Sequence, residues 1–109
     1  MDYSIVIPCF NEEATIKLIL DKTNKAFQEH NIELILVNNG STDNTKNILK
    51  DLIINYPNAR YINLHNNVGY GGGILKGLSC CKGEIIGWTH ADLQTDPLDC
   101  VKAFKKFAN

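Results

Sequence analysis

Three side chains at alternating positions have the spacing and chemistry of a metal site. His90, Asp92 and Gln94 follow an apolar run, and in an extended segment residues two apart point the same way. Carboxylate and amide oxygens suit Mg²⁺ or Mn²⁺ held jointly with phosphates, and an imidazole nitrogen favours Mn²⁺. Asp96 and Pro97 then close the segment as an ordinary helix start would. On spacing alone, metal binding and helix capping both stay open.

A glycine-rich run at 69–73 is the second candidate for ligand contact. The dinucleotide fingerprint GxGxxG fails, because counting from Gly69 places Ile74 where a small residue is required. A phosphate-binding P-loop fails as well, since the chain has no Gly-Lys-Ser/Thr triplet. Successive glycines allow the close approach of a ligand or of a neighbouring backbone. The run is compatible with ligand contact and with tight helix–sheet packing.

Hydrophobic periodicity places these segments in an alternating order of strands and helices. Short apolar, β-branched runs predict strands at 3–7, 33–37, 60–64 and 84–88. The first expected helix is capped by Asn11, has Glu12 and Glu13 in its first turn, and carries an apolar stripe of Ile16, Ile19, Leu20, Thr23 and Phe27. The second carries Ile48, Leu49, Leu52 and Ile53 and is stopped by Pro57. A third is expected over 69–81, and a fourth starts at Pro97. This alternation predicts a parallel sheet covered on both faces.

The polar segments of the chain fall where these strands end. In a parallel sheet with helices on both faces, ligands bind outside the carboxyl ends of the strands. Those ends are expected at 8–13, 38–43, 65–73 and 89–97, and they are rich in Asn, Asp, His, Gln and Gly. Turn chemistry alone also favours Asn, Asp and Gly. A binding edge and a set of ordinary turns are therefore both open.

Taken in order, these segments resemble the successive signatures of family 2 glycosyltransferases. The matching segments are Ile5 to Glu13, Leu36 to Asp43, Asn67 to Gly71 and Ala91 to Pro97. The resemblance covers nearly the whole chain, and the nearest subgroup is the polyprenyl-phosphate sugar synthases. It implies an α/β fold of the GT-A type, a three-layer Rossmann-like arrangement with a mainly parallel sheet. It also implies a nucleotide-diphosphate sugar donor, a divalent cation and inversion at the anomeric carbon.

The resemblance assigns donor binding to individual positions. They are Pro8, Phe10, Asn11, Glu13, Asn39, Gly71, Ala91 and Asp92. The first four match the segment that lines the base and ribose pocket. Asn39 is the second residue of an Asn-Asn pair that stands where the family has paired aspartates, the second of which contacts the base. An amide oxygen can still accept a hydrogen bond from a base N–H, although the charge is gone.

The metal motif of the family maps onto the alternating trio. Asp92 and Gln94 match it, and His90 replaces its first acid. The resemblance therefore implies Mg²⁺ or Mn²⁺ as cofactor. Asp92 should be the dominant ligand, because it is the only acid of the three and a hard cation requires that charge.

Composition limits the partners and the compartment. The chain has 109 residues, and 11 Lys and Arg stand against 12 Asp and Glu, so it has no electrostatic reason to bind nucleic acid. Its apolar runs are too short to span a bilayer, and Asp2 stands where a signal peptide would be basic. The four cysteines lack the spacing of a zinc site and fit a reducing compartment. We expect a cytoplasmic domain, working at the inner face of the membrane when the acceptor is a lipid.

These expectations combine into one functional hypothesis and two rivals. We expect 1–109 to be the nucleotide-diphosphate-sugar-binding part of a longer glycosyltransferase that uses a UDP- or GDP-sugar and a polyprenyl phosphate or cell-envelope glycan as acceptor. The motif that would deprotonate the acceptor is not visible, so no general base is assigned. One rival is a non-catalytic nucleotide-binding module. The other is a nucleotidyltransferase of similar fold, which should carry a glycine-rich, basic loop at 8–13, where neither residue type occurs.

The end of the predicted fold also bears on assembly. The expected last helix begins at Pro97, so part of the sheet is expected to lack the cover that a full domain supplies. Large uncovered apolar patches favour association. We therefore expect a homo-oligomer.

Overall fold

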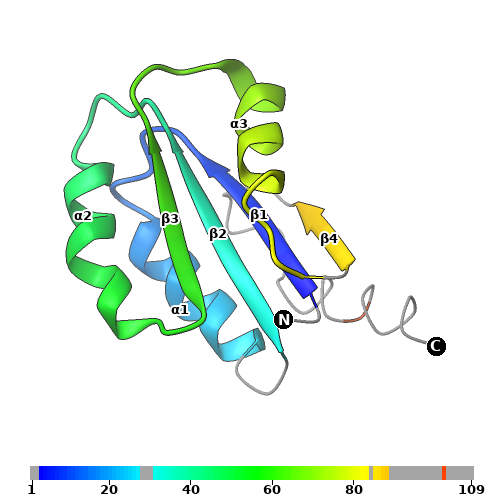
Figure 1. Cartoon of the computed structure of the whole chain (residues 1–109). Coiled ribbons are helices and arrows are strands. Elements are labelled where there is room, and N and C mark those ends of the chain that lie inside the picture. Colours follow the sequence, from blue (N-terminus) through cyan, green and yellow to red (C-terminus); the bar gives the residue numbers. More distant parts are fainter. Residues whose placement is uncertain (1–2, 28–30, 84, 89–101, 103–109) are drawn as a thin grey trace.

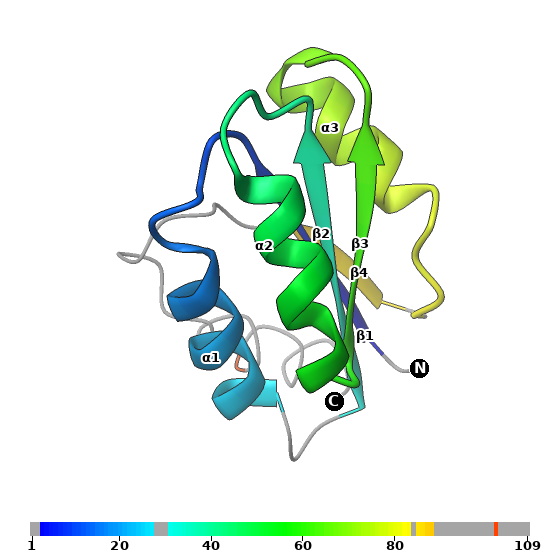
Figure 2. The ribbon, with the colours of Figure 1, turned by 90° about the vertical axis from the view of Figure 1, so that its left-hand side faces the viewer.

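The fold is a parallel four-stranded sheet between two layers of helices. The structure is a computed structural model that describes residues 3–27, 31–83, 85–88 and 102. The elements run in the order β1 (Tyr3–Cys9), α1 (Ile16–Phe27), β2 (Ile32–Asn39), α2 (Thr45–Leu52), the 3₁₀ turn η1 (Ile53–Asn55), β3 (Ala59–Leu64), α3 (Gly69–Leu78) and β4 (Ile85–Trp88). Figure 1 shows α3 on one side of the sheet, and Figure 2 shows α1 and α2 together on the other.

The strand order explains how the helices come to lie on two faces. The strands are ordered β3-β2-β1-β4, and every neighbouring pair is parallel. The chain moves from β1 through β2 to β3 in one direction, then crosses back over the sheet to place β4 on the other side of β1. Because such crossovers are right-handed, reversing the direction moves the connecting helix to the opposite face. The reversal lies between β1 and β4, the kind of position where ligands bind in these sheets.

The core consists of two apolar clusters, one on each face of the sheet. The strands β1 and β2 lie inside the sheet, and every residue of β2 is buried. Even-numbered β2 residues such as Leu34 and Leu36 pack toward α1 and α2 with Leu20 and Leu49. The residue between them, Ile35, packs on the α3 face. Burial on both faces is why the central stretches of these strands, 5–7 and 34–37, are continuously apolar instead of alternating.

Three of the four expected helices are present as α1, α2 and α3, with the start of α1 displaced and the end of α3 at Leu78 instead of 81. The predicted stripe of α1 is buried, as expected: Ile16, Ile19, Leu20, Thr23 and Phe27. The helix begins at Ile16, however, so the prediction that Asn11 caps it with Glu12 and Glu13 in the first turn is wrong. Asn11 has a left-handed backbone, with φ of 53°, and its side chain bonds to a different loop. The carboxamide serves a neighbouring segment instead of its own helix.

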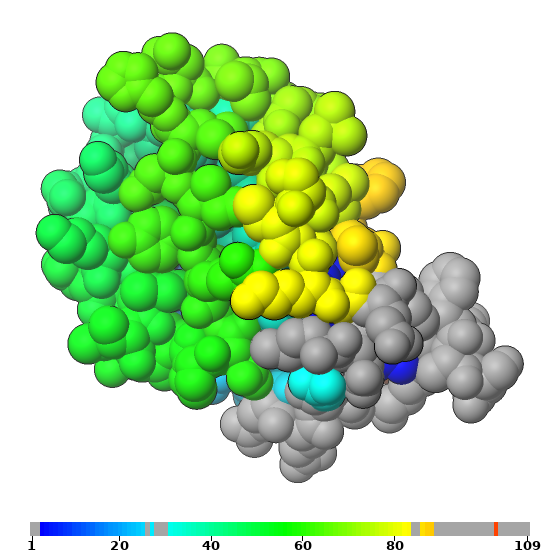
Figure 3. Space-filling view, in the orientation of Figure 1, coloured from blue at the N-terminus to red at the C-terminus, as the bar shows by residue number. Residues whose placement is uncertain are grey.

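The glycine-rich helix α3 lies close to the sheet. A Cβ added at Gly77 would lie 2.3 Å from Val6 Cγ1 and 2.9 Å from Val37 Cγ2, closer than side chains allow. Figure 3 shows this face, with the end of α3 and the α3–β4 connection in yellow beside the orange residues of β4. Tight helix–sheet packing therefore accounts for Gly77. It does not account for Gly71, where an added Cβ would meet nothing within 4 Å.

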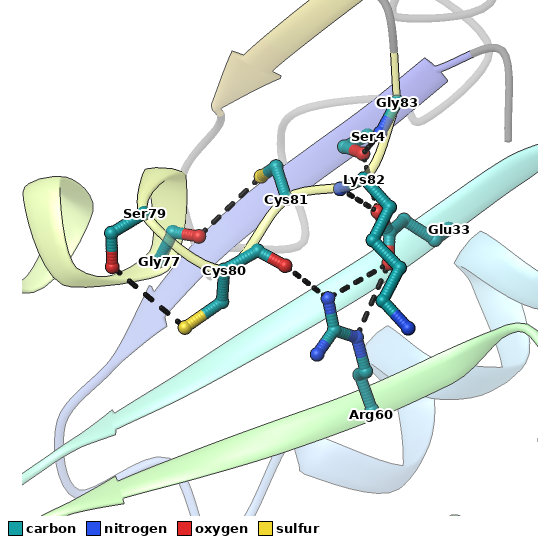
Figure 4. Close-up of polar contacts among 9 residues, drawn as sticks. All are labelled: Ser4, Glu33, Arg60, Gly77, Ser79, Cys80, Cys81, Lys82 and Gly83. Carbon is teal, nitrogen blue, oxygen red and sulfur yellow. Dashed lines mark hydrogen bonds and ion pairs between the residues drawn. The ribbon is translucent and has the colours of Figure 1, made fainter.

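A buried carboxylate holds the amino ends of the strands together. Glu33 on β2 is 3% exposed, and its oxygens accept hydrogen bonds from Ser4 Oγ at 2.6 Å and from the Lys82 N–H at 2.6 Å. Arg60 on β3 forms an ion pair with Glu33 at 3.1 Å and also donates to the Cys80 carbonyl. The N–H of Gly83 donates to Ser4 Oγ at 2.8 Å. This network, drawn in Figure 4, fixes the α3–β4 connection beside β1.

The charge of Glu33 is stabilised by these donors. Burial raises the pKa of the Glu33 carboxyl, but hydrogen bonds from Ser4, Lys82 and Arg60 outweigh it and hold the pKa below its ordinary value. The network is therefore built around an ionised carboxylate.

Among the described residues, no helix combines the length and apolar character needed to cross a membrane. The expected strand at 84–88 is β4, which begins at Ile85. The expected helix from Pro97 lies outside the described residues, apart from Lys102, which is helical.

Candidate functional site

The loops that follow β1 and β2 are joined side by side at the carboxyl edge of the sheet. Asn11 Oδ1 accepts the N–H of Thr42 at 2.8 Å and that of Asp43 at 3.3 Å, and Asn11 Nδ2 donates to Thr42 Oγ1 at 3.2 Å. The backbone N–H of Asn11 donates to Ser41 Oγ at 3.0 Å. The Asn11 carboxamide thus supplies hydrogen bonds to the second loop of the kind that a neighbouring strand would give. A non-glycine residue held at positive φ is a local strain that these contacts stabilise.

Further contacts extend this junction toward α2. The N–H of Glu12 donates to Thr45 Oγ1 at 2.9 Å, and Glu13 Oε2 accepts the N–H of Asn44 at 3.1 Å. Asp43 accepts the N–H and the hydroxyl of Thr45 at 2.9 and 2.5 Å. Burial raises the pKa of Asp43, but the hydrogen bonds from Thr45 and from the Glu13 N–H outweigh it and lower the pKa. The short hydroxyl side chains of this loop therefore act as structural links, a role the sequence analysis did not assign to them.

A second junction ties the end of β2 to the loop before α3. Asn39 is 4% exposed; its Nδ2 donates to the Gly69 carbonyl at 2.9 Å and its Oδ1 accepts the N–H of Val68 at 3.0 Å. The preceding residue points to the other face, where Asn38 Nδ2 donates to Asn63 Oδ1 at 2.9 Å. Asn38 Oδ1 is buried and has no hydrogen-bond partner among the described residues. The Asn-Asn pair therefore links β2 to β3 and to the turn that begins α3.

Six of the eight sequence-predicted donor residues lie at this edge: Asn39, described above, and five more. Pro8 is half-buried, and an added Cβ on Gly73 would lie 3.7 Å from its Cβ and 2.9 Å from Asn39 Nδ2. Phe10, Asn11 and Glu13 are exposed, with the Phe10 side chain 45% accessible. Gly71 lies in the first turn of α3, exposed and with open space over its Cα. Ala91 and Asp92, together with His90 and Gln94, lie outside the described residues.

The described residues do not by themselves supply a metal centre. No group of three or more His, Cys, Asp or Glu side chains that could hold a cation occurs among them. Cys9, close to this edge, is buried, and burial together with the charge of Glu12 raises the pKa of its thiol to about 12. The thiol is therefore a buried core group that stays protonated at neutral pH. The expected ligands at 90–94 follow directly after β4, whose carboxyl end lies beside β1.

This chain is similar to known proteins in sequence and in fold. The family model described as "Glycosyl transferase family 2" matches residues 4–109. The chain belongs to glycosyltransferase family 2. An undecaprenyl-phosphate 4-deoxy-4-formamido-L-arabinose transferase of Pseudomonas fluorescens is 35% identical to this family 2 chain over 98 residues, which are 86% of the chain and 28% of the relative. The chain spans about a third or less of the length of the curated relatives it matches (32% and 28% for two of them).

Solved structures carry the same fold. The structure of S. aureus TarS 1–349 in complex with UDP-GlcNAc superposes with a TM-score of 0.78 and 25% identity. The match covers 98% of this family 2 chain and 31% of the TarS chain. A second match is glucosyl-3-phosphoglycerate synthase from Mycobacterium tuberculosis in complex with Mn²⁺, UDP and glucosyl-3-phosphoglycerate, with a TM-score of 0.70 and 27% identity. It covers 92% of this chain and 37% of the synthase chain. These neighbours are GT-A glycosyltransferases, which confirms the expected three-layer GT-A arrangement with a parallel sheet.

Proposed function

We propose that the protein carrying this chain transfers a sugar from a nucleotide-diphosphate sugar to a polyprenyl phosphate, and that 1–109 is its donor-binding part. The observation that carries the proposal is the joined set of loops at the carboxyl edge, which gathers Pro8, Phe10, Asn11 and Asn39 beside the point where strand order reverses. Family membership and neighbours bound to UDP-GlcNAc or UDP support a nucleotide-sugar donor. A relative named for undecaprenyl phosphate supports the lipid acceptor.

The proposal gives each residue a role. The exposed ring of Phe10 offers a face on which a base can stack, with Pro8, Asn11 and Glu13 around it. Asn39, which is buried and bonded to Val68 and Gly69, supports the pocket from beneath. Gly71, which has no side chain and open space above it, lets the diphosphate approach the backbone. Ala91, which follows β4 in the sequence, would border the donor. These roles require no catalytic base within 1–109.

A divalent cation completes the proposed site. Asp92 would hold it as the main ligand, with Gln94 as a neutral oxygen donor and His90 as a nitrogen donor or a hydrogen-bond donor to the phosphates. Mg²⁺ or Mn²⁺ bound there would neutralise charge on the nucleotide diphosphate leaving group. A structural neighbour crystallised with Mn²⁺ supports the choice of metal.

Calorimetric titration of the chain with UDP and GDP, with and without Mn²⁺, tests this proposal. We expect metal-dependent binding that is no tighter than roughly micromolar, because a pocket built from one part of a longer enzyme lacks the contacts that bury the sugar. Asp92→Asn should remove most of the metal-dependent binding, and His90→Ala should remove less. Asp51→Asn, an exposed acid on α2, is the matched control. A folded sample that binds neither nucleotide at millimolar concentration would contradict the donor site.

The stacking role has its own test. Phe10→Ala should weaken nucleotide binding by roughly tenfold, since base–aromatic stacking is worth about 1–3 kcal/mol. Ile54→Ala, which truncates an 82% exposed apolar residue in the middle of η1, controls for loss of surface area. Equal affinities of both variants and the parent would place the base elsewhere.

The remaining parts of the proposal concern place and assembly. A polyprenyl phosphate acceptor is membrane-bound, so the protein would work at the cytoplasmic face of the membrane. A homo-oligomer remains our prediction, and light scattering that gives a monomer at high protein concentration would contradict it.

A further inference from the structure

Both polar atoms of the Asn39 carboxamide form hydrogen bonds with one neighbouring turn. Its Nδ2 donates to the carbonyl of Gly69, and its Oδ1 accepts the N–H of Val68. The side chain is buried, so these bonds are shielded from competition by water. The two contacts fall on consecutive residues, so the amide replaces a missing backbone partner for the turn that begins α3.

Only an amide satisfies this pair of contacts at neutral pH. A carboxylate could accept from the Val68 N–H, but it has no hydrogen to give to the Gly69 carbonyl and would place a negative charge against that oxygen. The family motif that this chain resembles has aspartate at this position, so the asparagine is a departure with a local partner. We propose that Asn39 is a positioning residue that locks the 67–73 turn of the donor site, and that this chain requires a carboxamide for the task.

Neighbouring glycines show that the turn is fitted closely to the end of β2. Gly40 has φ of +66°, and a Cβ there would lie 2.3 Å from the backbone nitrogen of Asn67. A Cβ on Gly73 would lie 2.9 Å from Asn39 Nδ2. Gly69 itself has φ of +83°, and its N–H donates to Asn67 Oδ1 at 2.7 Å. The turn therefore has little room to move unless the Asn39 contacts are broken.

Asn39 would affect ligand binding by fixing the backbone of Gly71. Gly71 lies two residues beyond the Gly69 carbonyl that Asn39 holds, so the position of its exposed backbone follows from the lock. The inference rests on the proposed function in one respect only, which is that a nucleotide is the ligand affected. The lock itself is a property of the free chain.

The test compares Asn39→Asp and Asn39→Ala with Asn55→Asp, which makes the same amide-to-acid change at an exposed site at the end of η1. Amide hydrogen exchange is followed by NMR in the free chain, and UDP affinity is measured with Mn²⁺. In Asn39→Ala the Val68 N–H should exchange about tenfold faster or more, the effect of losing a bond worth roughly 1.4 kcal/mol. Asn39→Asp should protect Val68 in part, shift the 69–73 resonances and weaken UDP binding. Asn55→Asp should match the parent in both measurements.

A second variant disturbs the Asn39 carboxamide without changing Asn39 itself. Gly73→Ala puts a methyl group against Asn39 Nδ2 while improving helix propensity, so faster exchange of Val68 would come from the displaced carboxamide and not from a weaker helix. This variant decides the question if the Asn39 substitutions unfold the chain.

The proposal is overturned if Asn39→Asp binds UDP as tightly as the parent or more tightly while Val68 exchange is unchanged, because Asn39 would then act on the base directly. If the parent itself binds no nucleotide, the proposed function fails, and Val68 exchange in the free chain still decides whether Asn39 locks the turn.

Discussion

The two ends of the sheet are held by different chemistry. At the amino end, an ionised carboxylate on β2 is buried and collects donors from β1, β3 and the α3–β4 connection. At the carboxyl end, amides, hydroxyls and the exposed carboxylates of Glu13 and Asp43 share the joining of the loops, and many of these contacts are exposed. The amino end thus concentrates its stability in one group, Glu33. The carboxyl end spreads it over several weak contacts that leave the outer faces of the loops accessible.

This difference is consistent with where a ligand is proposed to bind. A buried charge tolerates little change around it, because each lost donor leaves the carboxylate uncompensated. Loops joined by amides can lose or gain one contact at a modest cost, which suits an edge that must accept a ligand. The contrast predicts a graded series of effects on the free energy of unfolding.

The largest effect is expected at Glu33. Glu33→Ala leaves Ser4, Arg60 and the Lys82 N–H without their shared acceptor, and we expect the free energy of unfolding to fall by about 3 kcal/mol. The partial exposure of Arg60 keeps the loss from being larger, since its guanidinium can regain water. Urea unfolding measures the change, with Asp51→Ala on the exposed face of α2 as control. A loss equal to that of the control would refute the central role of Glu33.

The charge of Glu33 predicts a pH dependence. Its pKa is lowered in the folded state, so the stability it contributes is present above the unfolded-state pKa and is lost as pH falls through the folded-state pKa. Glu33→Gln should therefore unfold more easily than the parent at neutral pH, and the gap between the two should narrow in acid. Urea midpoints across acidic to neutral pH measure it. A gap that stays constant would mean that the ionised form is not what stabilises the network.

A smaller effect is expected at the carboxyl end, at Asn11. Asn11→Gly removes the contacts to Thr42 and Asp43 but tolerates the positive φ, and should cost about 1 kcal/mol. Asn11→Ala adds backbone strain and should cost about 2 kcal/mol. The difference between the two variants, measured by urea unfolding, isolates the strain. Equal losses would show that the left-handed conformation carries no cost at this site.

The strands were predictable from the sequence because their runs are short, apolar and β-branched, and because the two inner strands, β1 and β2, are buried on both faces. The start of α1 was not, because Asn11 fits the residue preferences of a helix cap while its side chain bonds to Thr42 and Asp43, more than thirty residues away. Local preference cannot reveal such a partner. The same limit applies to Glu33. The sequence predicted it only as the first residue of a strand, although it lies at the centre of a charged network.

The candidate site was predictable as an edge but not as a set of contacts. Ordered motifs located 8–13, 38–43 and 65–73 together, and the parallel sheet brings their loops to one end. What Asn39 contacts depends on how close Gly73 and Gly69 come to β2, and that distance is set by the packing of α3. Residue type gave the chemistry of the amide, and only the fold gives its partners.

The smallest effect is expected where a charged pair lies on the surface. Lys17 and Asp21 form an i,i+4 ion pair at 2.8 Å on α1, with side chains 65% and 49% exposed. Water already solvates both groups, and the basic residue precedes the acidic one, the less favourable order along the helix dipole. Asp21 also keeps its contact with the Tyr56 hydroxyl when Lys17 is removed. Lys17→Met should therefore leave the urea midpoint unchanged within error, at low and at high salt. A loss comparable to that of Glu33→Gln would show that burial is not what separates the two ion pairs, and the contrast between concentrated and distributed stabilisation would have to be drawn elsewhere.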